Sequence, residues 1–130
     1  MAALMPYVLV GLGGFIGANA RFVVARFVGA AVETRFPLGT FVINIAGSLA
    51  LGVLGTVIAE KITPNSEAMR LALGVGFLGA FTTFSTFEFE TNALLEDGSW
   101  WMATMNIVAS VVVGLVAVRA GIVLAKSWLT

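Results

Sequence analysis

The chain contains no cysteine and no histidine. It therefore has no disulfides, no thiol nucleophile and none of the commonest transition-metal ligands, which argues against redox and metal-centre enzymes. Charged residues are also scarce, at 11% of 130 residues, about half the share of an average soluble domain. The seven basic and seven acidic residues balance, and no basic cluster occurs, so nucleic acid is not an expected partner.

What the chain has in abundance is apolar sequence: 59% of its residues are hydrophobic, and the mean hydropathy is +1.02. All charged residues fall outside four uncharged runs, at 1–20, 36–59, 71–87 and 98–118. Each run has roughly the 17–25 residues that a helix needs to cross a bilayer. The runs are continuous rather than alternating, so helices are favoured over barrel strands. The sequence predicts an all-α integral membrane protein, a single four-helix domain over 1–130.

We expect the four transmembrane helices at about 7–27, 38–59, 71–89 and 100–126. Turn residues separate them, and Trp100, Trp101 and Trp128 suit the aromatic belts at the membrane surfaces. Gly13 and Gly17 form a GxxxG pair in the first helix, a spacing that predicts close helix packing.

Basic residues give the chain almost no preferred orientation in the membrane. One side would carry four of them and the other three: Lys61, Arg70, Arg119 and Lys126 against Arg21, Arg26 and Arg35. A chain so weakly biased can insert both ways, and two opposite copies can then pair. We therefore hypothesise dual topology and an antiparallel homodimer, since four helices alone have little room for a wet pathway.

Two helices carry polar stripes. The second places small and polar residues at four-residue steps on one face, namely Thr40, Asn44, Ser48, Gly52 and Thr56. The fourth does the same with Asn106, Ser110 and Gly114. Such stripes either hold helices together through hydrogen bonds or line a shared path.

The third segment begins as an ordinary apolar span and then changes character at 79–87, where glycine, β-branched residues and small hydroxyls follow one another. Helix propensity is poor there, and a break at 79–82 would release carbonyl oxygens that can hold a cation. Phe84 and Phe87 share a face beyond the break. They are either core packing or a pair of rings whose positive edges contact an anion.

At this point the residues resemble a known family. Arg21 in the segment 17–21, GTFVIN at 39–44 and GFLGAFTTFSTF at 76–87 are similar to the motifs of the Fluc/CrcB fluoride channels. The resemblance covers nearly the whole chain. It implies an antiparallel dual-topology homodimer with two fluoride pores and a central, structural Na⁺ at the interface.

The resemblance also assigns roles to individual positions. Asn44 corresponds to the pore asparagine, and Phe84 and Phe87 to the rings whose edges meet fluoride. Gly79 and Thr82 correspond to the residues whose backbone carbonyls hold Na⁺.

Further positions follow from the same resemblance. Glu90 matches an acidic residue of the pathway, and Arg21 a vestibule arginine. The remaining expected pore residues are polar: Ser85, Thr86, Ser110 and Asn106. The fourth helix departs from some members, which have tyrosine at 106 and serine at 114.

The resulting interpretation is a channel and not an enzyme, because no side chains are arranged as nucleophile, base or phosphate cradle. It would pass fluoride passively out of a prokaryotic cell across the inner (plasma) membrane and relieve fluoride toxicity. The alternative is a small dual-topology, proton-coupled exporter of cationic drugs, which needs a carboxylate inside the membrane; Glu60, Glu88 and Glu90 are expected near helix ends. A third reading is a subunit that assembles in the membrane without transporting.

Overall fold

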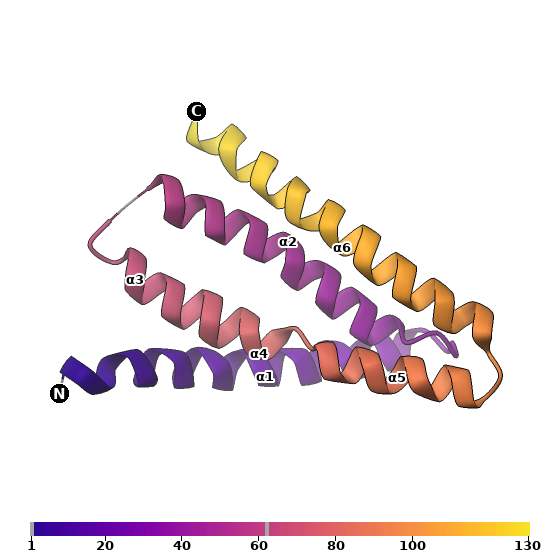
Figure 1. Cartoon of the computed structure of the whole chain (residues 1–130). Helices are drawn as coiled ribbons and strands as arrows, with labels where there is room; N and C mark the ends of the chain where they lie inside the picture. Colours follow the sequence, from indigo (N-terminus) through magenta and orange to yellow (C-terminus); the bar gives the residue numbers. More distant parts are fainter. Residues whose placement is uncertain (1, 62) are drawn as a thin grey trace.

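The computed structural model describes residues 2–61 and 63–130, and within them all regular secondary structure is helical (Figure 1). A short 3₁₀ turn, η1 (Ala2–Leu4), leads into the long helix α1 (Met5–Ala31), which has Pro6 in its first turn, where its missing N–H costs nothing. The helix α2 (Leu38–Glu60) begins directly after Pro37. The longest helix, α6 (Trp100–Leu129), follows a turn that contains Gly98.

The third passage consists of four consecutive pieces. It begins with α3 (Ser66–Met69), continues as the π-helix η2 (Arg70–Leu78) and the single turn α4 (Gly79–Phe81), and resumes as α5 (Phe84–Glu96). Figure 1 shows a short kinked connection between α4 and α5, after which α5 continues to the turn that precedes α6.

In the described residues four segments are long and apolar enough to cross a membrane, namely Met5–Ala31, Leu38–Glu60, Ser66–Glu96 and Trp100–Leu129. The all-α class and the four spans are therefore confirmed. The first, third and fourth segments extend beyond the predicted bounds by two to seven residues at one or both ends. The predicted bounds followed the apolar runs, whereas a helix continues through charged residues until a turn signal such as Gly98 (φ 75°) ends it.

The π-helical stretch was not predicted; 71–78 was expected to be ordinary α-helix. The N–H of Gly79 reaches back to the carbonyl of Gly74, one residue further than in an α-helix. Three glycines, at 74, 76 and 79, lie in or directly after this stretch. Insertions of this kind are frequent at functional sites.

The π-helix η2 packs directly against α1, as the GxxxG pair led us to expect. A Cβ atom on Gly13 would overlap the carbonyl oxygen of Ala72, and one on Gly17 would overlap that of Phe77. The two backbones are thus in contact, and the pair serves packing within the chain.

The long helices α2 and α6 lie side by side in the same close manner (Figure 1). A Cβ on Gly52 would overlap the carbonyl oxygen of Val118, and one on Gly121 that of Leu49. Small residues let the two backbones touch, which is how membrane helices associate where no hydrophobic driving force acts between them. The third passage packs mainly against α1 through η2 and α4, while α5 contacts α6.

The outer surface is strongly apolar. Phe15 and Phe27 on α1 are 71% and 73% exposed, and valines and leucines cover most of the outside of α6. In water such a surface would aggregate, whereas in a bilayer it faces lipid tails. Ion pairs lie at helix ends instead, with Lys126 Nζ 3.8 Å from Glu60 Oε1 and Arg35 Nη2 3.5 Å from Asp97 Oδ2.

Candidate functional site

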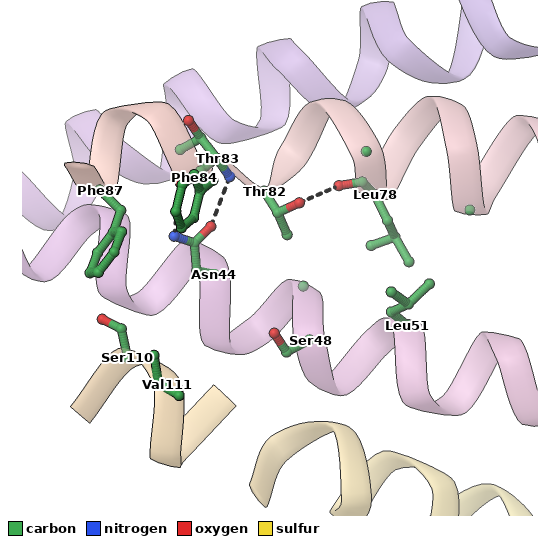
Figure 2. A pocket seen from close by; sticks show the side chains of 13 residues that line it. Asn44, Ser48, Leu51, Leu78, Thr82, Thr83, Phe84, Phe87, Ser110 and Val111 are labelled. Atoms are coloured by element: carbon green, nitrogen blue, oxygen red, sulfur yellow. Dashed lines mark hydrogen bonds between the residues drawn. The ribbon is translucent and has the colours of Figure 1, made fainter. Parts of the chain in front are cut away.

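A groove of about 360 Å³ opens where α2, α6 and the third passage meet (Figure 2). Its wall combines small, polar and aromatic residues: Asn44, Gly47, Ser48, Leu51, Gly74, Leu78, Gly79, Thr82, Thr83, Phe84, Phe87, Ser110 and Val111. The groove therefore lies at the junction of α4 and α5, beside the polar stripe of α2.

Two residues at this junction are extended rather than helical. Thr82 has φ −78° and ψ 156°, and Thr83 has φ −151° and ψ 113°. Gly79, by contrast, is helical at φ −62° and ψ −35°, so the extended stretch begins three residues later than the predicted 79–82. The Thr82 hydroxyl donates to the carbonyl of Leu78 at 2.9 Å, and the Thr83 hydroxyl oxygen accepts from the N–H of Thr86 at 3.3 Å, which caps α5.

Asn44 holds the extended backbone from the side of α2. The N–H of Thr83 donates to Asn44 Oδ1 at 2.8 Å, and Asn44 Nδ2 donates to the carbonyl of Thr83 at 3.0 Å. One amide side chain thus replaces both backbone partners that Thr83 would have in regular structure. Without such partners the two polar groups would be stranded in an apolar surrounding, which is costly.

The same junction releases two carbonyl groups from the helix. In a continuous helix the N–H of Thr83 would bond Gly79 and that of Thr86 would bond Thr82. Here the first N–H bonds Asn44 and the second bonds the Thr83 hydroxyl. The carbonyl oxygens of Gly79 and Thr82 have therefore lost their helical donors.

The two phenyl rings beyond the junction differ in exposure. Their centroids are 5.7 Å apart and the rings are tilted by 43°. Phe87 is 7% exposed and Phe84 is 74% exposed, so the outer ring stands largely free in a single chain. In Figure 2 both rings project from α5 on the side where Asn44 and Ser110 lie.

The two predicted pore residues on α6 have different surroundings. Ser110 lines the groove, whereas Asn106 is 1% exposed and does not line it. Asn106 Nδ2 donates to the Thr91 hydroxyl at 2.8 Å, and the Ser110 hydroxyl donates to Asn106 Oδ1 at 3.3 Å. The Thr91 hydroxyl in turn donates to the carbonyl of Phe87 at 2.7 Å. Asn106 therefore ties α6 to α5 through Thr91, one turn beyond Phe87.

Four other predicted site residues lie outside the groove wall. Ser85 and Thr86 are exposed on the first turn of α5, and Arg21 is half-buried on α1. Glu90 lies in the middle of α5 and not near a helix end, because α5 continues to Glu96. It lines a second cavity beside Arg35 and Asp97, and within the described residues its buried Oε2 has no hydrogen-bond partner.

Seven groove residues were not among the predicted site residues, namely Gly47, Ser48, Leu51, Gly74, Leu78, Thr83 and Val111. Thr83 could have been found as a candidate N-cap, because threonine is favoured at that position, where its side-chain oxygen accepts from a backbone N–H of the first turn. Gly47 and Ser48 lie one turn beyond Asn44 on α2, and the four-residue stripe already contained Ser48. The sequence gives no sign that Gly47 contacts Thr82, because that contact joins distant parts of the chain.

These features define a small, multi-span helical membrane protein with a polar groove at an interruption of its third span, the kind of site that transport proteins use. Residues 8–122 match the family described as CrcB-like protein, Camphor Resistance (CrcB). The chain belongs to this family, which consists of ion channels and not of enzymes.

Curated relatives cover almost the same length. A protein of Solibacter usitatus is 43% identical over 94% of this chain and 99% of its own. One of Chloroflexus aurantiacus is 44% identical over 90% and 92%, and one of Hydrogenovibrio crunogenus is 46% identical over 92% and 89%. All three are named fluoride-specific ion channel FluC.

Proposed function

We propose that this chain is a fluoride channel that lets the ion leave the cell down its own gradient and so relieves fluoride toxicity. The observation that carries the proposal is the groove, in which an amide, a hydroxyl and two phenyl rings converge inside an apolar bundle. The names of the relatives, which match this chain over nearly its whole length, support the choice of fluoride.

The chemistry of the groove suits a small, strongly hydrated anion. One N–H of Asn44 is committed to Thr83, and within the described part of the chain the second has no protein acceptor. That N–H can replace water around fluoride, and the Ser110 hydroxyl can join it when its hydrogen turns away from Asn106 Oδ1, to which it donates at 3.3 Å in the structure. The edges of Phe84 and Phe87 add a weak positive potential. None of the described residues that form the wall carries a positive charge, so the ion is not held too tightly to leave.

The functional unit in this proposal is an antiparallel homodimer with two pores at its interface. The near balance of basic residues supports insertion in both orientations. Phe84 is 74% exposed beside an open groove, so a second copy would be needed to close the pathway. Ser85 and Thr86, which face outward on α5, would then lie along the completed pathway, whereas Arg21 would serve at its vestibule and Glu90 at its far end.

A structural Na⁺ at the centre of the dimer fits the backbone at the junction. Hard cations prefer oxygen ligands, and the carbonyls of Gly79 and Thr82 have lost their helical donors. Two carbonyls from one chain make only part of a site, and the second copy would supply the others. When bound, the ion would lower the energy of a nearby anion and hold the two copies together.

The rival proton-coupled exporter needs a membrane-embedded carboxylate, and Glu90 is the residue that favours it, since its Oε2 is buried without a partner in the described residues. Its cavity also contains the Arg35–Asp97 ion pair, however, which belongs at a membrane surface. A non-transporting assembly subunit would require no polar groove.

The relatives come from bacteria, so the plasma membrane of a prokaryote is the expected location.

The function is tested with purified protein in liposomes loaded with fluoride or chloride. Fluoride should leave protein-containing vesicles and not protein-free ones, and chloride should stay. Equal efflux of chloride, or no efflux of either ion, contradicts the proposal.

The rival exporter is tested in parallel vesicles with an imposed pH gradient. The gradient should not drive uptake of a cationic dye; if it does, the exporter hypothesis replaces the channel. Exchange of Na⁺ for a large organic cation during purification should weaken the dimer.

Dual topology is tested in cells. Because the chain has no cysteine, Thr130→Cys introduces a single label site at the C-terminus. A membrane-impermeant maleimide should modify about half of the protein in intact cells and all of it after lysis. Labelling of all or none before lysis would show one orientation only.

A further inference from the structure

The wall of the groove contains a glycine whose missing side chain makes room for the extended backbone at the α4–α5 junction. Gly47 lies on α2 one turn beyond Asn44, so both face the third passage. A Cβ built on Gly47 would overlap the Cγ2 methyl of Thr82, and it would stand 3.4 Å from the Phe81 ring. No side chain larger than hydrogen fits here while Thr82 keeps its place.

Thr82 cannot easily turn its methyl away. Its hydroxyl, on the same Cβ atom, donates to the carbonyl of Leu78 at 2.9 Å, and rotation about that Cα–Cβ bond would break this contact. Its backbone is fixed from both sides as well. The Thr82 N–H bonds the same Leu78 carbonyl at 3.0 Å, and the next residue, Thr83, is held by Asn44.

We infer that Gly47 is a positioning residue of the channel: together with Asn44 it sets where the extended Thr82–Thr83 backbone lies against α2, and so where the freed Thr82 carbonyl points and how wide the groove is. Asn44 does this by hydrogen bonding and Gly47 by leaving space. The inference rests on the proposed function for its transport consequence, while the contact itself stands on the geometry alone.

The test is a double-substitution cycle between the two helices. Gly47→Ala should lower fluoride efflux from liposomes by about ten-fold or more, because a group in a site loses much of its effect when displaced by about an ångström. Thr82→Ser keeps the hydroxyl for Leu78 and removes the methyl that Ala would meet. In the Thr82→Ser background, Gly47→Ala should therefore change efflux by less than about two-fold, since the overlap has gone.

The matched control is Gly55→Ala, two turns further along the same helix. It brings the same gain in helix propensity, but its Cβ would meet no atom of the described residues within 4 Å. Efflux and the thermal unfolding midpoint should stay at or above those of the unsubstituted protein. If Gly47→Ala behaves like Gly55→Ala, or if Thr82→Ser does not rescue it, the inference is wrong.

The unfolding midpoint and the yield of folded protein are also measured for the same variants, because neither measurement requires transport. If the unsubstituted protein carries no fluoride, the proposed function fails, yet rescue of stability by Thr82→Ser still decides the role of Gly47. If Gly47→Ala yields no folded protein, Thr82→Ser must restore it. A double variant that remains unfolded would overturn the inference.

Discussion

Replacement of Asn44 by alanine is the most direct test of how the junction is held. The substitution removes two hydrogen bonds, of 2.8 and 3.0 Å, and leaves the N–H and carbonyl of Thr83 without the partners they have in the structure. At about 1–3 kcal/mol for each buried polar group left without a partner, the loss amounts to about 2–6 kcal/mol of the free energy of unfolding. Denaturant unfolding in detergent measures it, and fluoride efflux should fall with it.

Two further variants, Asn19→Ala and Asn44→Asp, are compared with Asn44→Ala. Asn19→Ala removes a bond of 2.7 Å to the carbonyl of Phe15, but this bond is exposed and within one helix, so its loss should cost less than about 0.5 kcal/mol. Asn44→Asp keeps an acceptor for the Thr83 N–H but sets a negative charge against the Thr83 carbonyl and against any anion in the groove. It should retain less efflux than alanine. If Asn44→Ala unfolds like Asn19→Ala, Asn44 does not hold the junction.

The other predictions concern the two phenyl rings, the α5–α6 contact and the packing of α2 against α6. Phe84→Ile and Phe87→Ile should each lower fluoride efflux while the protein stays folded, and normal efflux in both would remove the role of the ring edges. Asn106→Ala should cost about 1–3 kcal/mol in unfolding, because two hydroxyl partners lose their bonds, but it should reduce efflux less than Asn44→Ala does. Gly121→Ala should cost about 1–3 kcal/mol in unfolding by separating α2 from α6. Gly29→Ala, whose Cβ would meet no described atom within 4 Å, should not, and equal unfolding midpoints for the two variants would contradict the packing.

The number and class of the spans could be predicted because they depend on local properties. Charge segregates sharply from the apolar runs, and each run has the length of a bilayer crossing. The stripe on α2 could be predicted too, since helical spacing alone places Asn44 and Ser48 on one face, and both line the groove.

What the sequence did not predict depends on contacts between distant segments. Poor helix propensity indicated a weak helix near 79–82, but the extended residues are Thr82 and Thr83, because Asn44 can bond only a residue that α2 brings within reach. The same limit applies to Asn106, where a polar residue on a stripe was expected to face the pathway. It faces Thr91 instead, because the spacing of a stripe does not tell which neighbour covers it.

In the proposed channel, the side chain of Asn44 both holds the α4–α5 junction and contacts the anion. An amide has one acceptor and two N–H donors, and Asn44 uses the acceptor and one donor on Thr83. These two bonds fix the plane of the amide, and with it the direction of the remaining N–H. The donor proposed to meet fluoride is therefore oriented before the ion arrives and needs no rearrangement as the ion passes. A change at Thr83 that breaks either bond should reduce efflux through Asn44, even though α2 itself is unaltered.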